Sequence, residues 1–441
     1  MNCNCDECKY NLEFSLPDEI LQSAVQGNLV IFAGAGISTE TKKIFKQTFY
    51  QDIREELEID DFPDFPEIMQ MFCNKVNGRR LLLEKLKYRF DYCHQFNELY
   101  RSASSFHQEL SSIECIDTII TTNWDDYFER ECAATPIVTP EDFAFYNVDG
   151  RKVLKIHGSI DNYGSIIATT SDYNKCYKNL KNGIIGSYLK TILATKTIVF
   201  IGFSFSDFDF NKIYSYLKKE MKDIIPHIYI VTIDESFKEK FIKEKSTIII
   251  TDGKFFIHKL RVWLEEKKYL IPKDNLNFIY ELEYLRLIFH KRSTELFLSN
   301  KTSTNIFNLY YQDGLQHAFD FLIFHSKSGK AFNPYFILNL LESYEEIRID
   351  LSKNKNYQDL VYLYGFTNGI QAILNNEDID SFPFFYILGK GEITNVEEYI
   401  NLTKSNEIFH KAGEKYCKKY LFEIFQKDSE SDIIPHHRPF F

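Results

Sequence analysis

The chain has 441 residues, of which 44% are hydrophobic and 26% are charged, and its formal net charge at pH 7 is −11. This composition is that of an ordinary globular protein with a sizeable core, long enough for about two or three domains. The negative charge argues against a protein that binds nucleic acid mainly by electrostatic attraction, and we expect no direct nucleic-acid binding.

The N-terminal sequence shows no targeting segment and no membrane span. No apolar run of the chain approaches the length needed to cross a bilayer. We expect the nine cysteines to be reduced and the protein to be cytoplasmic, without membrane contact. Cys3, Cys5 and Cys8 form a C-x-C-x-x-C cluster, but no fourth ligand of matching spacing follows nearby. We therefore expect residues 1–19 to form an N-terminal tail rather than a zinc site.

Residues 20–270 predict one α/β domain. Short continuous apolar runs, typical of strands buried on both faces, alternate with helical patterns. This alternation favours a doubly wound parallel sheet, whose ligand binds at the carboxyl ends of the strands. The predicted strands cover 29–33, 118–122, 153–156, 197–202, 228–233 and 247–250. The predicted helices cover 41–59, 79–92, 125–132, 184–193 and 208–219.

Two further regions complete the predicted organisation. Pro63 and Pro66 exclude a helix interior at 60–66, and we expect a helical insertion from about residue 60 to 112. Apolar residues at helical spacing predict a mainly α-helical C-terminal domain over 275–430, for oligomerisation or partner binding. We expect 431–441 to be a disordered tail, with His436 and His437 in a frayed terminus rather than in a metal site. The expected C-terminal helices cover 276–289, 305–324, 334–347, 356–374 and 394–426.

The first predicted strand ends in two glycines one residue apart. Residues 29–38 read LVIFAGAGIS, a β-branched and aromatic run that leads into Gly34 and Gly36. Such a strand end delivers a dinucleotide pyrophosphate to backbone N–H groups, and glycine lets the phosphates approach. The dehydrogenase fingerprint has a third glycine where this chain has Thr39. A tight turn that needs positive φ is the alternative explanation for the glycines.

Three more predicted strands end in unusual polar residues. The segments are TTNWDD at 121–126, KIHGS at 155–159 and GFSFSD at 202–207. In a parallel sheet these ends face the same crevice as the glycines, which brings together Asn123 as an orienting group and His157 as a base. Taken singly, Asn123 or Asp125 could cap a helix, and His157 could be an interior histidine. Their shared place on one edge of one sheet favours a ligand site.

These four segments, GAGIS, TNWD, KIHGS and GFSxxD in this order, resemble the sirtuin NAD-binding domain over residues 20–255. The TNxD and GxSxxDxD forms are most similar to the bacterial sirtuin-like branch of anti-phage defence, whose domains consume NAD⁺. The resemblance implies that Asn123 and His157 are catalytic. Asn123 would orient the ribose or the attacking water, and His157 would be the general base, because histidine is the side chain most often used for base catalysis near physiological pH.

The resemblance also implies which residues bind NAD⁺, here the substrate rather than a redox cofactor. Asp125 would accept a hydrogen bond from the nicotinamide carboxamide, and Thr232 and Asp234 would contact the adenosine ribose. The residues with an implied binding role are Gly34, Ala35, Gly36, Ser38, Asp125, Gly202, Ser204, Thr232 and Asp234.

One departure from the family concerns zinc. Deacylating sirtuins usually carry zinc-binding cysteines in C-x-x-C pairs after the catalytic histidine, whereas Cys176 is the only cysteine between His157 and Leu276. No zinc and no cofactor beyond the NAD⁺ substrate is therefore expected, and deacylation is disfavoured.

The sequence predicts an NAD⁺ glycohydrolase that gives nicotinamide and ADP-ribose, as an abortive-infection effector. The alternatives are an NAD-dependent protein deacylase or ADP-ribosyltransferase, and a non-catalytic sensor of NAD or ADP-ribose. Because a free NADase would harm its host, the resemblance implies a homo-oligomer or a partner such as a HerA-type ATPase or a short Argonaute. The chain has no Walker A motif, so any ATPase would be a separate protein.

Overall fold

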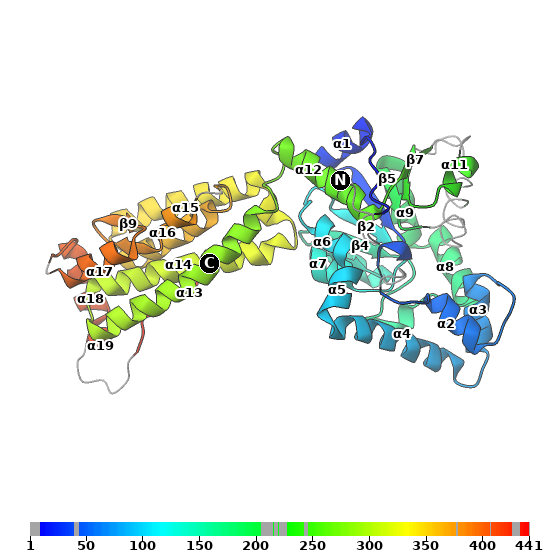
Figure 1. Cartoon of the computed structure of the whole chain (residues 1–441), viewed down its shortest axis with the longest axis horizontal. Helices are drawn as coiled ribbons and strands as arrows, with labels where there is room; N and C mark the ends of the chain where they lie inside the picture. The colour runs from blue at the N-terminus through cyan, green and yellow to red at the C-terminus, as the bar shows by residue number, and fades with distance from the viewer. Residues whose placement is uncertain are drawn as a thin grey trace. The chain divides into compact units, whose positions relative to one another are not determined.

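The computed structural model describes residues 9–38, 44–203, 215, 219, 227–241, 246–375, 378–405, 407–425 and 433–440. The chain divides into two compact units, residues 1–266 and 267–441. Unit 1 holds a parallel sheet with its helices, and unit 2 is mainly helical (Figure 1). This confirms the predicted fold class of an α/β domain followed by a helical region.

In the part of unit 1 that the structure describes, a seven-stranded sheet has the order β3-β4-β2-β1-β5-β6-β7. Every neighbouring pair is parallel. All the predicted strands are present, whereas β3 was missed because it is a short edge strand that contains Pro136. The strands are β1 (Leu29–Ala33), β2 (Thr118–Thr121), β3 (Thr135–Ile137), β4 (Lys152–Lys155), β5 (Thr197–Ile201), β6 (Ile228–Thr232) and β7 (Ser246–Ile250).

Helices cover both faces of the sheet because successive side chains of a strand point to opposite faces. Phe32 and Phe200 pack against α8 (Thr170–Asn182) and α9 (Ile184–Thr195). On the other face, α1 (Asp18–Val25) contacts β1 and β5, and α12 (Gly253–Glu266) contacts β6. The sheet is therefore doubly wound. Two short helices, α7 (Tyr127–Cys132) and α11 (Ser236–Phe241), follow the ends of β2 and β6.

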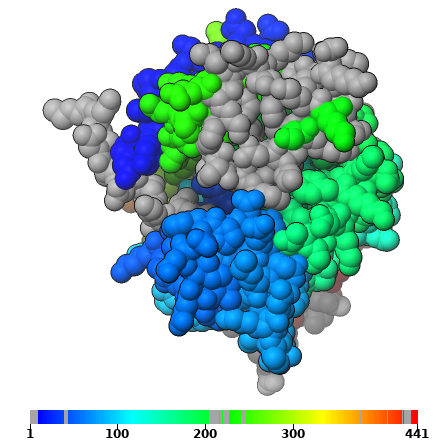
Figure 2. All heavy atoms as spheres, turned by 90° about the vertical axis from the view of Figure 1, so that its right-hand side faces the viewer, coloured from blue at the N-terminus to red at the C-terminus, as the bar shows by residue number. Residues whose placement is uncertain are grey.

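The helical insertion has a small apolar core of its own. Trp124, Ile160 and Ile166, from the loops after β2 and β4, belong to this core. Figure 2 shows the insertion in blue against α8 and α9, and an α3–α8 contact joins them. The insertion therefore supports the carboxyl ends of β2 and β4. Its helices are α3 (Phe65–Cys73), α4 (Gly78–Gln95), α5 (Asn97–Ala103) and α6 (Ser105–Ser111), and the preceding helix α2 (Phe49–Glu56) packs on the same core.

The segment before α1 packs on unit 1 rather than forming a loose tail. The Phe14 ring stacks on Phe256 with 5.6 Å between ring centroids. The backbone N–H of Asp252 donates to the Tyr10 carbonyl at 2.9 Å. Residues 9–17 thus contact α12 and the end of β7. Cys3, Cys5 and Cys8 lie outside the described residues, as does the predicted helix at 208–219 apart from two isolated positions.

Unit 2 is built around the pair α14 and α16. Glycine lets their backbones lie close together. A Cβ on Gly314 would lie only 2.1 Å from the Tyr362 carbonyl oxygen, and one on Gly365 would lie 2.0 Å from the Tyr311 carbonyl oxygen. A hairpin of two three-residue strands, β8 (Phe385–Ile387) and β9 (Gly391–Ile393), was not predicted. The helices are α13 (Asn275–Ser299), α14 (Ser303–Ser326), α15 (Pro334–Asn354), α16 (Tyr357–Gln371), α17 (Val396–Lys404), α18 (Lys411–Tyr420) and α19 (Phe422–Phe425).

Residues 433–440 pack on unit 2, so the expectation of a disordered end was wrong for this segment. The backbone N–H of His437 donates to Asp313 Oδ2 at 2.6 Å, and its Nε2 lies 3.0 Å from Asp359 Oδ1. The His437 ring also stacks on Tyr362 with 4.2 Å between centroids. These partners come from α14 and α16, and nothing in the local sequence indicates them. No helix among the described residues is long and apolar enough to cross a membrane.

Candidate functional site

The ends of β1 and β5 meet through three glycines. Gly34 N–H donates to the Ile201 carbonyl at 2.8 Å, and Gly36 N–H donates to the Gly202 carbonyl at 2.9 Å. A Cβ on Gly34 or Gly36 would lie 2.8 Å from the Gly202 oxygen, and Gly202 itself has φ +79°. The glycines are therefore required by this close approach of two strand ends, whether or not a phosphate also binds there. The turn continues through the 3-10 helix η1 (Ala35–Ile37) to Ser38.

Asn123 follows β2 and its side-chain amide faces the turn after β1. Its Nδ2 donates to the Gly34 carbonyl at 3.2 Å and to Ser38 Oγ at 3.3 Å. The side chain is buried, and its Oδ1 has no hydrogen-bond partner among the described residues. Because buried polar atoms are nearly always paired, this oxygen is a candidate acceptor for a ligand or water.

Asp125 lies beside this amide, and both of its carboxylate oxygens accept hydrogen bonds from the chain. Oδ2 accepts from the Ser38 hydroxyl at 2.9 Å, and Oδ1 accepts from the Tyr127 N–H at 3.3 Å. Burial raises the pKa of Asp125, and the charge of Lys155 and the Ser38 hydroxyl oppose that rise. Asp125 thus accepts from the first residue of α7 and contacts the turn after β1 at the same time.

His157 occupies the matching position after the neighbouring strand β4. Thr121 of β2 pairs with Lys155 of β4. Asn123 comes two positions after Thr121, and His157 comes two positions after Lys155. The Ile156 N–H donates to the Thr121 carbonyl at 2.9 Å, which continues the ladder beyond the strands. The His157 ring is buried and lies edge-on to Tyr173, with 4.9 Å between centroids. Asn123 and His157 therefore lie at the same edge of the sheet, as expected.

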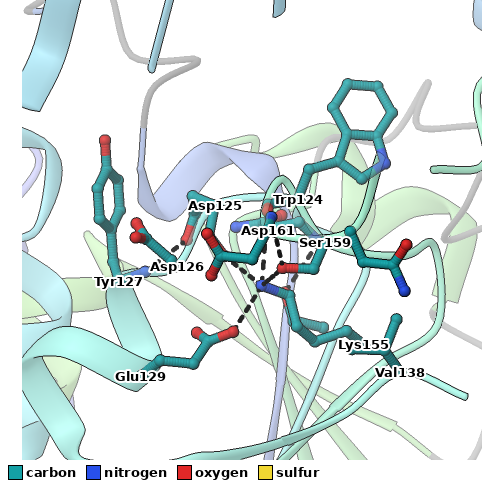
Figure 3. A network of polar contacts seen from close by, with 12 residues as sticks. Trp124, Asp125, Asp126, Tyr127, Glu129, Val138, Lys155, Ser159 and Asp161 are labelled. Carbon is teal, nitrogen blue, oxygen red and sulfur yellow. Dashed lines mark hydrogen bonds and ion pairs between the residues drawn. The ribbon is translucent and has the colours of Figure 1, made fainter. Parts of the chain in front are cut away.

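Lys155 forms the centre of a polar network between β4 and the loop after β2. No role was expected for this residue. Its side chain has no exposed surface, and its Nζ lies 2.8 Å from Glu129 Oε1. The ammonium also donates to Ser159 Oγ at 3.1 Å and to the Asp125 carbonyl (Figure 3). Burial raises the pKa of Glu129, and the adjacent Lys155 charge opposes it. The position of Lys155 inside the apolar run VLKI was the sequence signal that could have indicated a buried lysine.

The other predicted contacts lie at the ends of β5 and β6. The Thr232 hydroxyl donates to the Phe203 carbonyl at 3.3 Å and accepts from the Asp234 N–H at 3.1 Å. Asp234 Oδ1 accepts from the Ser236 N–H at 3.0 Å in the first turn of α11. These side chains shape the loop after β6. Gly202 and Gly36 lie together as described, and Ser204 lies outside the described residues.

Behind this network, His107 of α6 is completely buried. Burial, with the nearby charge of Lys155, lowers the pKa of His107 to about 3 from 6.5. In the unfolded chain this histidine therefore binds a proton below about pH 6.5. In the folded chain it binds that proton only near pH 3. The free energy of unfolding should then fall between these pH values as the pH is lowered, by at most about 1.4 kcal/mol per pH unit from this residue.

Urea unfolding at several pH values in this window measures the effect, with His107→Phe as the matched variant. The comparison uses the slope against pH, so a constant packing change in the variant does not matter. The variant should show the shallower slope. Equal slopes in the two proteins would show that His107 does not contribute.

The described residues contain no group of three or more His, Cys, Asp or Glu side chains placed to hold a metal ion. Residues 117–250, which include the ends of β2, β4, β5 and β6, match the family model of the SIR2-like domain. This part of the chain is therefore similar to the SIR2-like domain. The parallel sheet and the strand-end segments of unit 1 agree with this assignment.

Named relatives of the SIR2-like domain come from several bacteria. The chain is 31% identical to NAD(+) hydrolase ThsA of Enterococcus faecium over 49% of this chain and 45% of that protein. It is 29% identical to NAD(+) hydrolase ThsA of Cytobacillus dafuensis over 45% of this chain and 40% of that protein. It is 25% identical to Defense-associated sirtuin 2 of Bacillus subtilis over 49% of this chain and 22% of that protein. The chain thus covers less than half the length of each of these relatives.

Proposed function

We propose that this chain is an NAD⁺ glycohydrolase that depletes NAD⁺ as an effector of bacterial anti-phage defence. The names of its relatives, NAD(+) hydrolase and Defense-associated sirtuin, support both parts of the proposal. The observation that carries it is the Asn123 Oδ1 atom, a buried acceptor without a partner among the described residues. It lies at the strand ends where a SIR2-like domain is expected to bind NAD⁺.

The reaction breaks the bond between the ribose C1′ atom and the pyridinium nitrogen of NAD⁺. The electron pair of that bond goes to the nitrogen, so nicotinamide leaves as a neutral molecule. Water forms the new bond to C1′ and gives up a proton. Asn123 Oδ1 accepts a hydrogen bond from the water or a ribose hydroxyl, and His157 accepts the proton. Holding these groups at fixed strand ends supplies much of the rate enhancement.

The proposed phosphate contacts are at the turn after β1. Gly36 is exposed and Ala35 is partly exposed, so a ligand can approach the turn from outside. The N–H groups of Gly34 and Gly36 already donate to the last residue of β5 and to Gly202 after it. Thr232 and Asp234 are proposed contacts on the side of the sheet where β6 ends. Ser204, which lies outside the described residues, stays a proposed contact from the sequence alone.

Incubation of the purified chain with NAD⁺ tests the proposed reaction, with chromatography of the products. We expect equal amounts of nicotinamide and ADP-ribose, without any requirement for an acylated peptide. Nicotinamide release only in the presence of an acylated peptide would indicate a deacylase. A protein that binds NAD⁺ and leaves it intact would be a sensor.

We further propose that unit 2 assembles copies of the chain through α13, as in the homo-oligomer that the resemblance implies. Tyr280, Tyr284, Leu287 and Ile288 of α13 are 49%, 66%, 54% and 49% exposed. Their spacing places them on one side of the helix. A contiguous exposed apolar surface of this kind is typical of an interaction site.

Leu287→Glu is expected to lower the oligomer mass measured by light scattering, because a charge on this surface opposes burial against a second copy. Leu338→Glu is the matched control, since Leu338 on α15 is 52% exposed and lies outside the α13 surface. The control should keep the wild-type mass. A monomeric wild type, or the same mass for Leu287→Glu, would contradict self-assembly through α13.

A further inference from the structure

We infer that Ser38 and Asp125 are positioning residues that fix the orientation of the Asn123 amide, so that the amide presents its oxygen as an acceptor. The three side chains come from the turn after β1 and the loop after β2. Asn123 Nδ2 lies 3.3 Å from Ser38 Oγ, and Ser38 Oγ lies 2.9 Å from Asp125 Oδ2. Their exposures are 6%, 2% and 2% for Asn123, Ser38 and Asp125, so water does not compete freely for these bonds.

The groups at the two ends of this series of hydrogen bonds fix which atom donates in each of them. The Gly34 carbonyl can only accept, so the group of Asn123 that lies 3.2 Å from it must be the NH₂ group. At the other end, an ionised Asp125 can only accept, so the single Ser38 proton is donated to Asp125. Ser38 Oγ must then accept from Asn123. Both amide protons are used, and Oδ1 is the part of Asn123 left for another partner.

A rotated amide would be unfavourable at both contacts. Its oxygen would face the Gly34 carbonyl oxygen, and two acceptors at hydrogen-bond distance repel each other. It would also face the Ser38 oxygen, whose proton is engaged by Asp125. Burial raises the pKa of Asp125, and the positive charge of Lys155 opposes that rise and so favours the ionised form. The direction of the Ser38 bond depends on that ionised form, whereas the contact with the Gly34 carbonyl orients the Asn123 amide in either case. The network therefore selects one of the two orientations of the Asn123 amide.

This inference rests on the proposed NAD⁺ hydrolysis and gives both Ser38 and Asp125 a different task from the NAD⁺ contacts implied by the sirtuin resemblance. In the contact role Asp125 accepts from the nicotinamide carboxamide, whereas in the structure its two oxygens already accept one hydrogen bond each, from Ser38 and Tyr127. In the positioning role Asp125 affects the rate of cleavage through Asn123. In the contact role it affects binding of the nicotinamide group itself.

Steady-state kinetics of Asp125→Asn, Ser38→Ala and Ser38→Thr distinguish the two roles. For positioning, we expect Asp125→Asn and Ser38→Ala to lower kcat by about a hundredfold, since a misplaced orienting group has effects of this size. KM for NAD⁺ and inhibition by added nicotinamide should stay as in the wild type. Ser38→Thr keeps the hydroxyl and should retain most of the activity.

Two results would overturn the inference. One is a wild-type kcat in Ser38→Ala, and the other is an Asp125→Asn variant with raised KM and weakened nicotinamide inhibition. Thermal unfolding of each variant checks that the fold is kept, and Ser38→Thr shows whether the hydroxyl itself is needed. If the wild type cleaves no NAD⁺, the proposed function fails. If the wild type cleaves NAD⁺ and Ser38→Ala cleaves it equally fast, only the positioning inference fails.

Discussion

Replacing Asn123 with Ala should lower the rate of NAD⁺ cleavage at least about a hundredfold, and His157→Ala should do the same. The first change removes the only acceptor that Asn123 offers, since both protons of its amide are engaged by Gly34 and Ser38. The second removes the proposed general base. Nicotinamide release, followed by chromatography at saturating NAD⁺, measures both effects.

The control for these variants is Asn28→Ala. Asn28 directly precedes β1, so it lies at the amino edge of the sheet, and its Oδ1 accepts from Lys196 at 2.8 Å. The same substitution there removes an amide without touching the site, and cleavage should continue at the wild-type rate. Circular dichroism should show a folded protein in every case. Full activity in a folded Asn123→Ala or His157→Ala variant would contradict the proposed mechanism.

The sequence identified the strands that build the site because strands buried on both faces are continuous apolar runs. Leu29–Ala33 and Thr197–Ile201 are of this kind, and polar residues after such runs fall at one edge of a parallel sheet. β3 was missed because it has three residues and contains Pro136. The hairpin β8–β9 is equally short. Strands of this length depend on their neighbours in space rather than on a local pattern.

The reasons for individual residues were harder to predict than their places. Gly34 and Gly36 suggested a phosphate cradle, but the close approach of Gly202 already requires both of them. That approach joins positions far apart in the chain, so a local motif cannot show it. His437 was expected in a frayed end for the same reason, because its partners Asp313 and Asp359 are distant in sequence.

Lys155 shows the same limit in electrostatic terms. Its place in KIHGS was visible, but its partners were not, because Glu129 and the Asp125 carbonyl come from the loop and helix after β2. A lysine at the end of a strand usually extends to solvent. Here the charge is buried with acceptors from α7 and from the loops after β2 and β4 (Figure 3).

Lys155→Met is expected to lower the free energy of unfolding by about 3–5 kcal/mol, which is the effect of removing one partner from a buried ion pair. Methionine keeps most of the length of the stem, so the loss comes mainly from the missing ammonium group. The carboxylates of Glu129 and Asp125 would then lie close together without a compensating charge, and the Asp125 carbonyl would lose its donor. Urea unfolding of the two proteins under one set of conditions measures the difference.

The double variant Lys155→Met/Glu129→Gln separates charge from packing. If the uncompensated Glu129 charge causes the loss, neutralising it should restore part of the stability, because an ion pair replaced as a whole costs much less than one broken on one side. If the loss came from packing of the lysine stem, the double variant would be no more stable than Lys155→Met. A single variant as stable as the wild type would mean that the buried ammonium contributes nothing net, and Lys155 would then have no structural task at these strand ends.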